Sequence, residues 1–267
     1  MSLADLTLDH WCSLDAAAAG RIAREAAAQA DGRLVLLDTV EHLGRPLHRV
    51  RIEREGREFA LVPGGPVRLG FDLDAWEPTP AQRADYAESV AEGYGYGHDT
   101  LEGHLAEMLS PSRTTALAAV LMAVEGEPLT ECPAGTPAAL AARGLRMPGP
   151  DEWEHACGAG AGTLFRWGNE CPLDEPSYGG GSGVRLRRNA FGLHIAYDSY
   201  GTELSTDPAV VHGGDGGEAV CGGYGDLLAW LPLATAHRNP SAAEFAYGPD
   251  GEGMFEEFST RPVFSLR

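Results

Sequence analysis

The chain has 267 residues, of which 43% are hydrophobic, and its formal net charge at pH 7 is −19. This length and apolar content are enough for a packed core, in one large domain or two small ones. The acidic balance argues against nucleic acid or an anionic membrane surface as a partner, since both attract clustered positive charge. A neutral or cationic partner, either a protein or a small molecule, fits better.

No stretch is long and apolar enough to span a membrane, and the N-terminal residues lack the basic and apolar regions of a signal peptide. We therefore expect a cytoplasmic protein. Its cysteines are odd in number, irregularly spaced and without a CxxC pair, which favours reduced thiols over a zinc site or a disulfide framework. They are Cys12, Cys132, Cys157, Cys171 and Cys221.

The first 45 residues predict a helix and a strand that pack on the rest of the chain. Ser13 is a suitable cap for a helix that runs to Gly32 with an alanine-rich apolar face. A strand is expected at residues 34–38. Residues 46–65 then alternate apolar and polar side chains on both sides of Glu55 and Gly56, which is typical of a β-hairpin. We place the boundary inside this hairpin, between an extension (1–45) and a domain (46–267).

Three helices are expected between the hairpin and residue 125. Thr79 followed by Pro80 is a cap and a first-turn proline for a helix that ends near Gly93. Residues 101–109 and 114–124 also show helical spacing of apolar side chains. Residues 177–183 and 213–217 are rich in glycine and predict loops, and residues 240–262 predict a surface loop.

Residues 146–170 have the best-defined local pattern. Pro150 sets the backbone for a helix start, and acidic residues at positions 151, 152 and 154 suit the N-terminal end of the helix dipole. Trp153, Ala156 and Cys157 share one face, and a Gly-Ala repeat at 158–162 then ends the helix. We expect this helix to dock on the core through Trp153, with Trp167 covering the same core.

The segment RMPGPDEWEHACGAGAGTLFRWGNE (146–170) resembles the signature of the formylglycine-generating, sulfatase-modifying enzyme family. Four further segments resemble landmarks of that family in the same order along the chain: 59–72, 79–90, 188–204 and 220–238. The resemblance implies an α+β fold, the family's variant of the C-type lectin fold. Low regular secondary structure and an N-terminal helix-strand extension are expected with it.

The resemblance also implies a metal chemistry that this sequence lacks. Relatives that oxidise cysteine to formylglycine hold copper(I) with two cysteines in the interval that corresponds to 224–238, and soft thiolates suit that ion. Here the interval contains no cysteine, and Leu227 and residues 230–232 stand at the two positions. The family's calcium-binding element is replaced by Gly-Thr-Glu-Leu at 201–204, so we assign no calcium site, although Glu203 is acidic.

Two interpretations of the altered segments stay open. In the first, His194, His212, Asp215 and His237 form a relocated iron or copper site of an oxidase or sulfoxide synthase-like enzyme, because histidine and carboxylate are the ligands of non-haem iron. In the second, these histidines are ordinary packed or solvated residues. The iron-binding helix of the sulfoxide synthases is not reproduced, since His98 and His104 lie six residues apart and point to different sides of a helix.

The last third of the chain also combines aromatic and acidic residues. This composition predicts an aromatic pocket with an acidic rim, suited to a cationic or peptide ligand, in a groove formed by residues 194–258. We therefore favour a binding protein without catalytic activity (a pseudoenzyme) over the relocated-metal enzyme, and place a formylglycine-generating oxidase last. The predicted ligand-binding residues are Tyr224, Asp226, Trp230, His237, Arg238, Phe245 and Tyr247.

Overall fold

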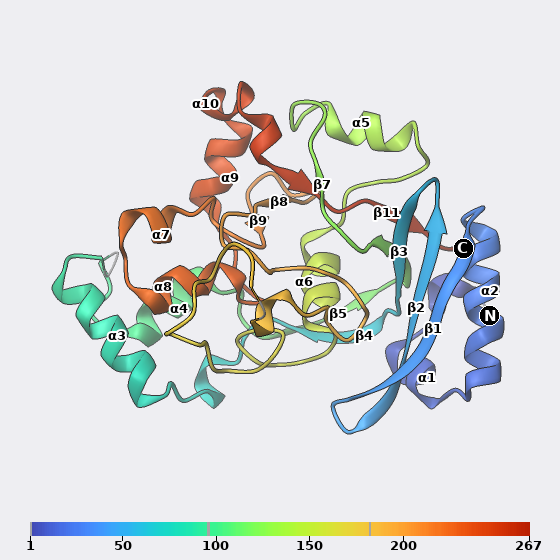
Figure 1. Cartoon of the computed structure of the whole chain (residues 1–267), viewed down its shortest axis with the longest axis horizontal. Helices are drawn as coiled ribbons and strands as arrows, with labels where there is room; N and C mark the ends of the chain where they lie inside the picture. Colours follow the sequence, from blue (N-terminus) through green and yellow to red (C-terminus); the bar gives the residue numbers. More distant parts are fainter. Residues whose placement is uncertain (1, 95–96, 182) are drawn as a thin grey trace.

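A five-stranded antiparallel sheet organises one half of the molecule (Figure 1). The computed structural model describes residues 2–94, 97–181 and 183–267, and has 34% helix and 23% strand, a mixed α+β structure with open sheets. Regular structure is therefore more abundant than the sequence led us to expect. In order across the sheet, the strands are β1 (Arg33–His42), β2 (Arg45–Arg54), β3 (Arg57–Val62), β6 (Val120–Ala123) and β11 (Val263–Ser265).

The predicted hairpin is confirmed, and the helix predicted at 114–124 is wrong. β2 and β3 pair antiparallel around Glu55 and Gly56, which both have positive φ. The segment 114–124 instead contributes to two strands, β5 (Arg113–Leu117) and β6. All four residues of β6 are buried between β3 and β11, and a fully apolar central strand cannot be distinguished from a buried helix by periodicity alone.

The N-terminal helices cover the outer side of this sheet (Figure 1). They are η1 (Leu3–Asp5), α1 (Leu8–Ser13) and α2 (Ala16–Gln29). Asp15 caps α2 by accepting a hydrogen bond from the Ala18 N–H at 2.7 Å, so the predicted cap at Ser13 is wrong. The small residues Ala19, Ala23 and Ala26 are fully buried, and they belong to the same hydrophobic core as strands β2, β3 and β6.

Helix α6 (Pro150–Gly158) starts at Pro150 as predicted and anchors the centre of the molecule. Its Trp153 is fully buried, and the indole N–H donates to Glu203 Oε2 at 2.7 Å. The same carboxylate pairs with Arg261, whose side chain has no exposed surface. The guanidinium also donates to three backbone carbonyls, those of Ala123, Val124 and His194. This buried ion pair uses both oxygens of Glu203.

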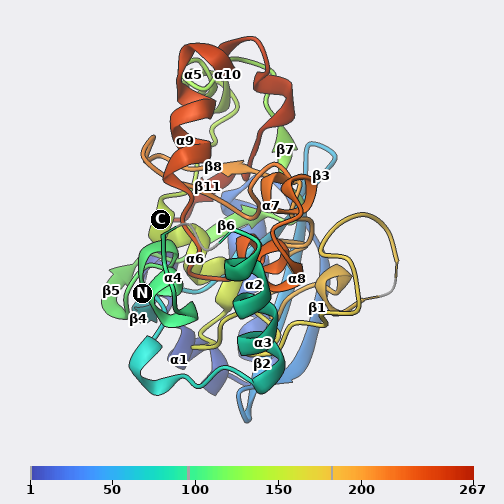
Figure 2. The ribbon, with the colours of Figure 1, turned by 90° about the vertical axis from the view of Figure 1, so that its left-hand side faces the viewer.

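Two smaller sheets complete the β structure. One has the order β7 (Glu127–Pro128), β10 (Ser259–Thr260), β8 (Glu203–Leu204) and β9 (Val211–His212), and the other pairs β4 (Gly65–Leu69) with β5. Both views place three helices at one end of the molecule, α5 (Thr136–Ala141), α9 (Pro240–Tyr247) and α10 (Pro249–Glu252) (Figures 1 and 2). The surface loop predicted for 240–262 is therefore wrong, because this segment holds α9, α10, η5 (Phe255–Glu257) and β10.

A second hydrophobic core lies at the end remote from the large sheet (Figures 1 and 2). The elements that contribute to it are η2 (Leu73–Ala75), α3 (Pro80–Ala91), α4 (Leu101–Met108), α8 (Asp226–Trp230) and η4 (Leu231–Leu233), and α7 (Glu218–Gly222) packs beside α8. The predicted start of α3 is confirmed by a capping box between Thr79 and Gln82. Trp167 stacks on Phe165 at 5.0 Å and packs against this second core, whereas we had expected it on the core of Trp153.

Among the described residues, no helix combines the length and the apolar character needed to cross a membrane.

Candidate functional site

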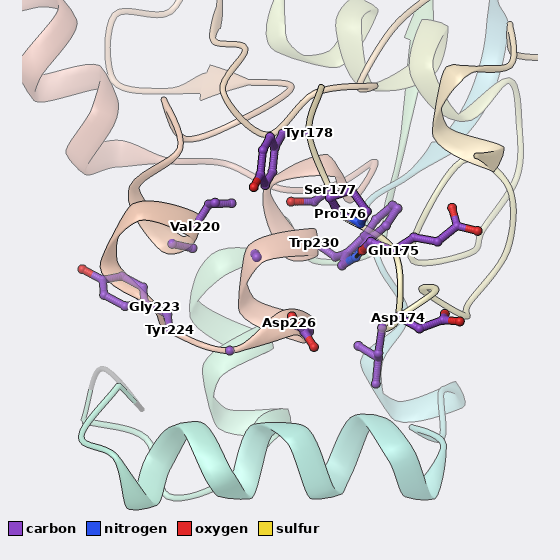
Figure 3. Close-up of a pocket in the computed structure, with 14 residues that line it drawn as sticks. Asp174, Glu175, Pro176, Ser177, Tyr178, Val220, Gly223, Tyr224, Asp226 and Trp230 are labelled. Carbon is purple, nitrogen blue, oxygen red and sulfur yellow. Dashed lines mark hydrogen bonds between the residues drawn. The ribbon is translucent and has the colours of Figure 1, made fainter. Parts of the chain in front are cut away.

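A cavity with a volume of about 630 Å³ lies beside three of the predicted ligand-binding residues (Figure 3). The helix pair α7–α8 forms one wall, and the segment 173–178 forms the other. We call this cavity the main pocket. Figure 3 shows Tyr178 at one end of the space and Asp226 at the other, with Trp230 on the wall between them.

Helix α3 serves as the platform for the α7–α8 wall. The Asp85 carboxylate on α3 accepts the N–H of Leu227 at 2.8 Å and so caps the first turn of α8 from another helix. Gly225, at φ 103°, lies against α3 so closely that a Cβ there would be 2.1 Å from the Ser89 hydroxyl. Only glycine fits this position, and the turn between α7 and α8 is therefore fixed by sequence and packing together.

The opposite wall is held by a buried arginine and a pair of serines. The Arg185 guanidinium donates to the carbonyls of Pro176 at 3.0 Å and Gly179 at 2.7 Å. Ser177 and Ser199 lie within hydrogen-bond distance, 2.9 Å between their hydroxyl oxygens. The guanidinium group of Arg185 is therefore directed at backbone carbonyls, and Arg185 does not line the main pocket.

Three of the predicted ligand-binding residues, Tyr224, Asp226 and Trp230, line the main pocket. The Trp230 indole N–H donates to the Glu175 carbonyl at 3.1 Å and so joins the two walls. Tyr224 is half-buried and stacks on Tyr94 with ring centroids 4.9 Å apart. Trp230 and Tyr224 are therefore both held in place by contacts with other residues.

The main pocket is acidic. Asp174, Glu175 and Asp226 are all exposed at its rim, and none of the fourteen lining residues that the structure describes is basic. Partial burial, together with the charge of Asp85, raises the pKa of Asp226. The third aromatic residue, Tyr178, is 41% exposed and makes an edge contact with Tyr200 at 5.2 Å.

Three residues of the second wall, Asp174, Glu175 and Tyr178, were not predicted from the sequence. They belong to an irregular segment in which helical or strand periodicity gives no signal. A signal was nevertheless available, because Asp-Glu-Pro-Ser-Tyr at 174–178 has the same acidic and aromatic composition that drew attention to the last third of the chain.

The other predicted ligand-binding residues lie elsewhere. Arg238 donates to Glu154 at 3.0 Å and Asp151 at 3.3 Å, carboxylates that it shares with Arg113. His237 is buried and lines a separate, smaller cavity. The structure therefore places Arg238 in an ion-pair network with two buried or half-buried acids.

Phe245 and Tyr247 lie on α9 and do not line the main pocket. Phe245 is 41% exposed, with its ring centroid 6.1 Å from that of Phe258. The Tyr247 hydroxyl donates to the Ser205 carbonyl at 3.2 Å. Instead of one groove over residues 194–258, the structure divides the predicted residues among the main pocket, the smaller cavity, the Arg238 network and α9.

Three of the four residues of the predicted metal set, His194, His212 and Asp215, each contact different parts of the protein. His194 pairs with Glu125 at 2.9 Å and stacks on Tyr197, whereas His212 stacks on Trp153 with ring centroids 4.7 Å apart. Asp215 accepts the N–H groups of Gly217 and Ala219 at the start of α7. Across residues 2–94, 97–181 and 183–267, no three His, Cys, Asp or Glu side chains are grouped so that they could hold a metal ion.

Metal analysis checks the alternative directly. Protein purified without a metal-affinity tag is expected to contain no stoichiometric iron or copper, because no three His, Cys, Asp or Glu side chains among the described residues are grouped to hold a metal ion. Elemental analysis by mass spectrometry is the measurement. Stoichiometric metal in the wild type that disappears in the double variant H212A/H237A would restore the relocated-metal interpretation.

The positions that the resemblance assigned to the two copper cysteines lie in a hydrophobic core. Leu227, Trp230 and Leu231 are at most 2% exposed and pack in the second core. All five cysteines are free thiols, and burial raises the pKa of Cys157 and Cys171 to about 12, so both stay protonated at neutral pH.

No protein-family model and no curated protein matches this sequence.

Proposed function

We propose that this protein is a binding module that takes an organic cation, such as the side chain of a basic peptide, in the main pocket. The observation that carries the proposal is the composition of the pocket wall: three acidic residues and the accessible rings of Tyr178 and Tyr224, above the buried ring of Trp230, with no basic residue among its described lining. Cations bind over aromatic faces, and neighbouring carboxylates strengthen that attraction.

The size and rigidity of the main pocket support this proposal. A volume of about 630 Å³ lies within the usual range for small-molecule sites, roughly 300–1,000 Å³. Trp230 and Tyr224 are held by contacts with Glu175 and Tyr94, so a ligand does not have to order them. Preformed walls reduce the entropy that is lost on binding.

We further propose that the scaffold is the formylglycine-generating-enzyme variant of the C-type lectin fold, with residues 46–267 as the domain and 1–45 as an extension. Five segments resemble that family in the same order, and α6 begins at Pro150 and buries Trp153 as the family signature implies. The apolar packing of Leu227 and Trp230 at the copper positions supports a pseudoenzyme.

Calorimetric titration with three probes tests the binding function. N-acetyl-arginine amide and N-acetyl-trimethyllysine amide are expected to bind, and N-acetyl-glutamate amide is expected not to bind, because the rim is anionic. Affinity for the two cations should fall as salt is added, since the rim carboxylates are exposed and screened. Equal affinity for the cations and the anion would contradict the proposal.

Variants at the rim show whether the cations occupy the main pocket. Asp226→Asn and Tyr178→Ala are each expected to weaken cation binding about fivefold, the effect of losing one exposed ion pair or one exposed cation–π contact. Both side chains are exposed, so the fold should not suffer. Glu244→Gln on α9 is the matched control, an exposed carboxylate away from the pocket, and should bind like the wild type.

A further inference from the structure

A second cavity, of about 170 Å³, lies on the other side of the α7–α8 wall. Its apolar surface comes from Met108, Leu228, Leu231 and Pro232. His104 on α4, Asp215 before α7 and His237 give it a polar side. We call this cavity the histidine cavity. The volume corresponds to about five or six water molecules, so it fits only a small molecule.

His237 is the unusual residue of the histidine cavity. It is 2% exposed, its ring makes no hydrogen bond with the residues that the structure describes, and its Nδ1 is enclosed. The backbone is held in place, because the His237 N–H donates to the Ala234 carbonyl at 3.1 Å. Because Nδ1 is enclosed, Nε2 is the ring nitrogen that a bound molecule can reach, and a ligand without a polar group would leave it buried and unpaired at a cost of about 1–3 kcal/mol.

The charges that line the histidine cavity indicate whether its ligand is charged or neutral. Burial lowers the pKa of His237 to about 4, so the ring is uncharged at neutral pH. Glu107, Asp215 and Glu218 also line the cavity, and its described lining contains no arginine or lysine. An anionic molecule would meet carboxylates without a compensating cation. A neutral molecule with an apolar body and one polar group matches both surfaces.

We propose that the histidine cavity is a binding site for a small neutral alcohol or phenol, whose hydroxyl group pairs with the imidazole of His237 and whose apolar body packs on Leu228, Leu231 and Pro232. A hydroxyl group both donates and accepts, so it can satisfy either tautomer of the ring. This site does not depend on the cation site proposed above.

Phenol, benzene and benzoate form a matched set of probes for ligand-observed NMR and calorimetry on the full chain. Phenol is expected to bind at least about tenfold more tightly than benzene, because a site with an unpaired polar group discriminates against the analogue that lacks the hydroxyl. Benzoate is expected not to bind. Absence of phenol binding, or equal affinity for phenol and benzene, would overturn the proposal.

Two variants locate the binding. His237→Phe keeps a ring in place but removes its nitrogens, so the preference for phenol over benzene should disappear. Ser241→Trp places a large side chain at an exposed lining position and should weaken both ligands without disturbing the core. Phenol bound by His237→Phe as tightly as by the wild type would refute the assignment.

Two controls separate this site from other effects. His212→Phe changes a buried histidine that does not line the histidine cavity, and Asp226→Asn changes only the main pocket. Both are expected to bind phenol like the wild type. Loss of phenol binding in Asp226→Asn would place phenol in the main pocket and would likewise contradict the proposal.

Discussion

Replacing Arg261 by methionine is expected to lower the free energy of unfolding by about 3–5 kcal/mol, the usual effect of removing one partner of a buried ion pair. Arg261 has no exposed surface, and Glu203 would be left as a buried carboxylate whose one close donor among the described residues is the Trp153 N–H. Three backbone carbonyls would also lose their donor. Urea denaturation followed by circular dichroism measures the loss.

Two further variants test this explanation. The double variant R261M/E203Q removes the unpaired charge and should recover part of the lost stability. Arg68→Met is the matched control, because Arg68 forms an exposed pair with Asp72, and its loss should change the stability by at most about 1 kcal/mol. If Arg261→Met is no more destabilising than Arg68→Met, the buried ion pair between Arg261 and Glu203 does not stabilise the fold as expected.

The protein is expected to lose stability steeply as pH falls from 6.5 to 4.5. Burial lowers the pKa of His104 and His237 to about 4 and that of His212 to about 3, and the positive charge of Arg238 adds to the shift of His212. In the unfolded chain each histidine titrates near its ordinary pKa of about 6.5. The unfolded state therefore binds more protons in this pH range, and each such histidine lowers the unfolding free energy by about 1.4 kcal/mol per pH unit.

His212 is the residue best suited to test how a buried histidine makes the stability depend on pH. Neither ring nitrogen of His212 makes a hydrogen bond of normal geometry with a described residue, and the ring stacks on Trp153. His212→Phe should therefore keep the packing at pH 7 and lose about 2–3 kcal/mol less than the wild type between pH 6.5 and 4.5. The pKa of the Asp215 carboxyl, which burial raises, opposes the trend equally in both proteins.

Urea denaturation at several pH values gives the comparison. His10→Gln, a change at an exposed helix position, is the control and should show the pH dependence of the wild type. Parallel stability curves for His212→Phe and the wild type would contradict the assignment of the acid sensitivity to buried histidine.

Local signals in the sequence predicted the elements whose ends are set by their own residues. The hairpin around Glu55 and Gly56 needs two positive φ angles at its turn, and α3 and α6 begin with a proline after a suitable cap. The strand β6 was missed because its burial between β3 and β11 overrides the helical preference of its leucine, methionine and alanine.

Residues 240–262, which begin with α9, were misread as a loop for a different reason. Their glycines, prolines and acidic residues gave the average composition of a loop. The helix start was visible, since the Asn239 side chain accepts the Ala242 N–H at 2.9 Å immediately before Pro240. Ala243 and Ala246, which are buried, supply its apolar face.

One wall of the main pocket could be predicted from the sequence, and the other could not. Tyr224, Asp226 and Trp230 all lie within a seven-residue segment, so the sequence alone shows that aromatic and acidic side chains occur together there. Asp174 and Tyr178 join them only through packing between segments about fifty residues apart, and the hydrogen bond from Trp230 to the Glu175 carbonyl records that packing. No local pattern encodes such a contact.

Ala219 on α7 lines both the main pocket and the histidine cavity, so a single helical turn separates the two spaces. A molecule that shifts this turn on one side reshapes the volume on the other. Thermodynamic linkage then requires the influence to run equally in both directions. Any such coupling would pass through α7, an element that both cavities share.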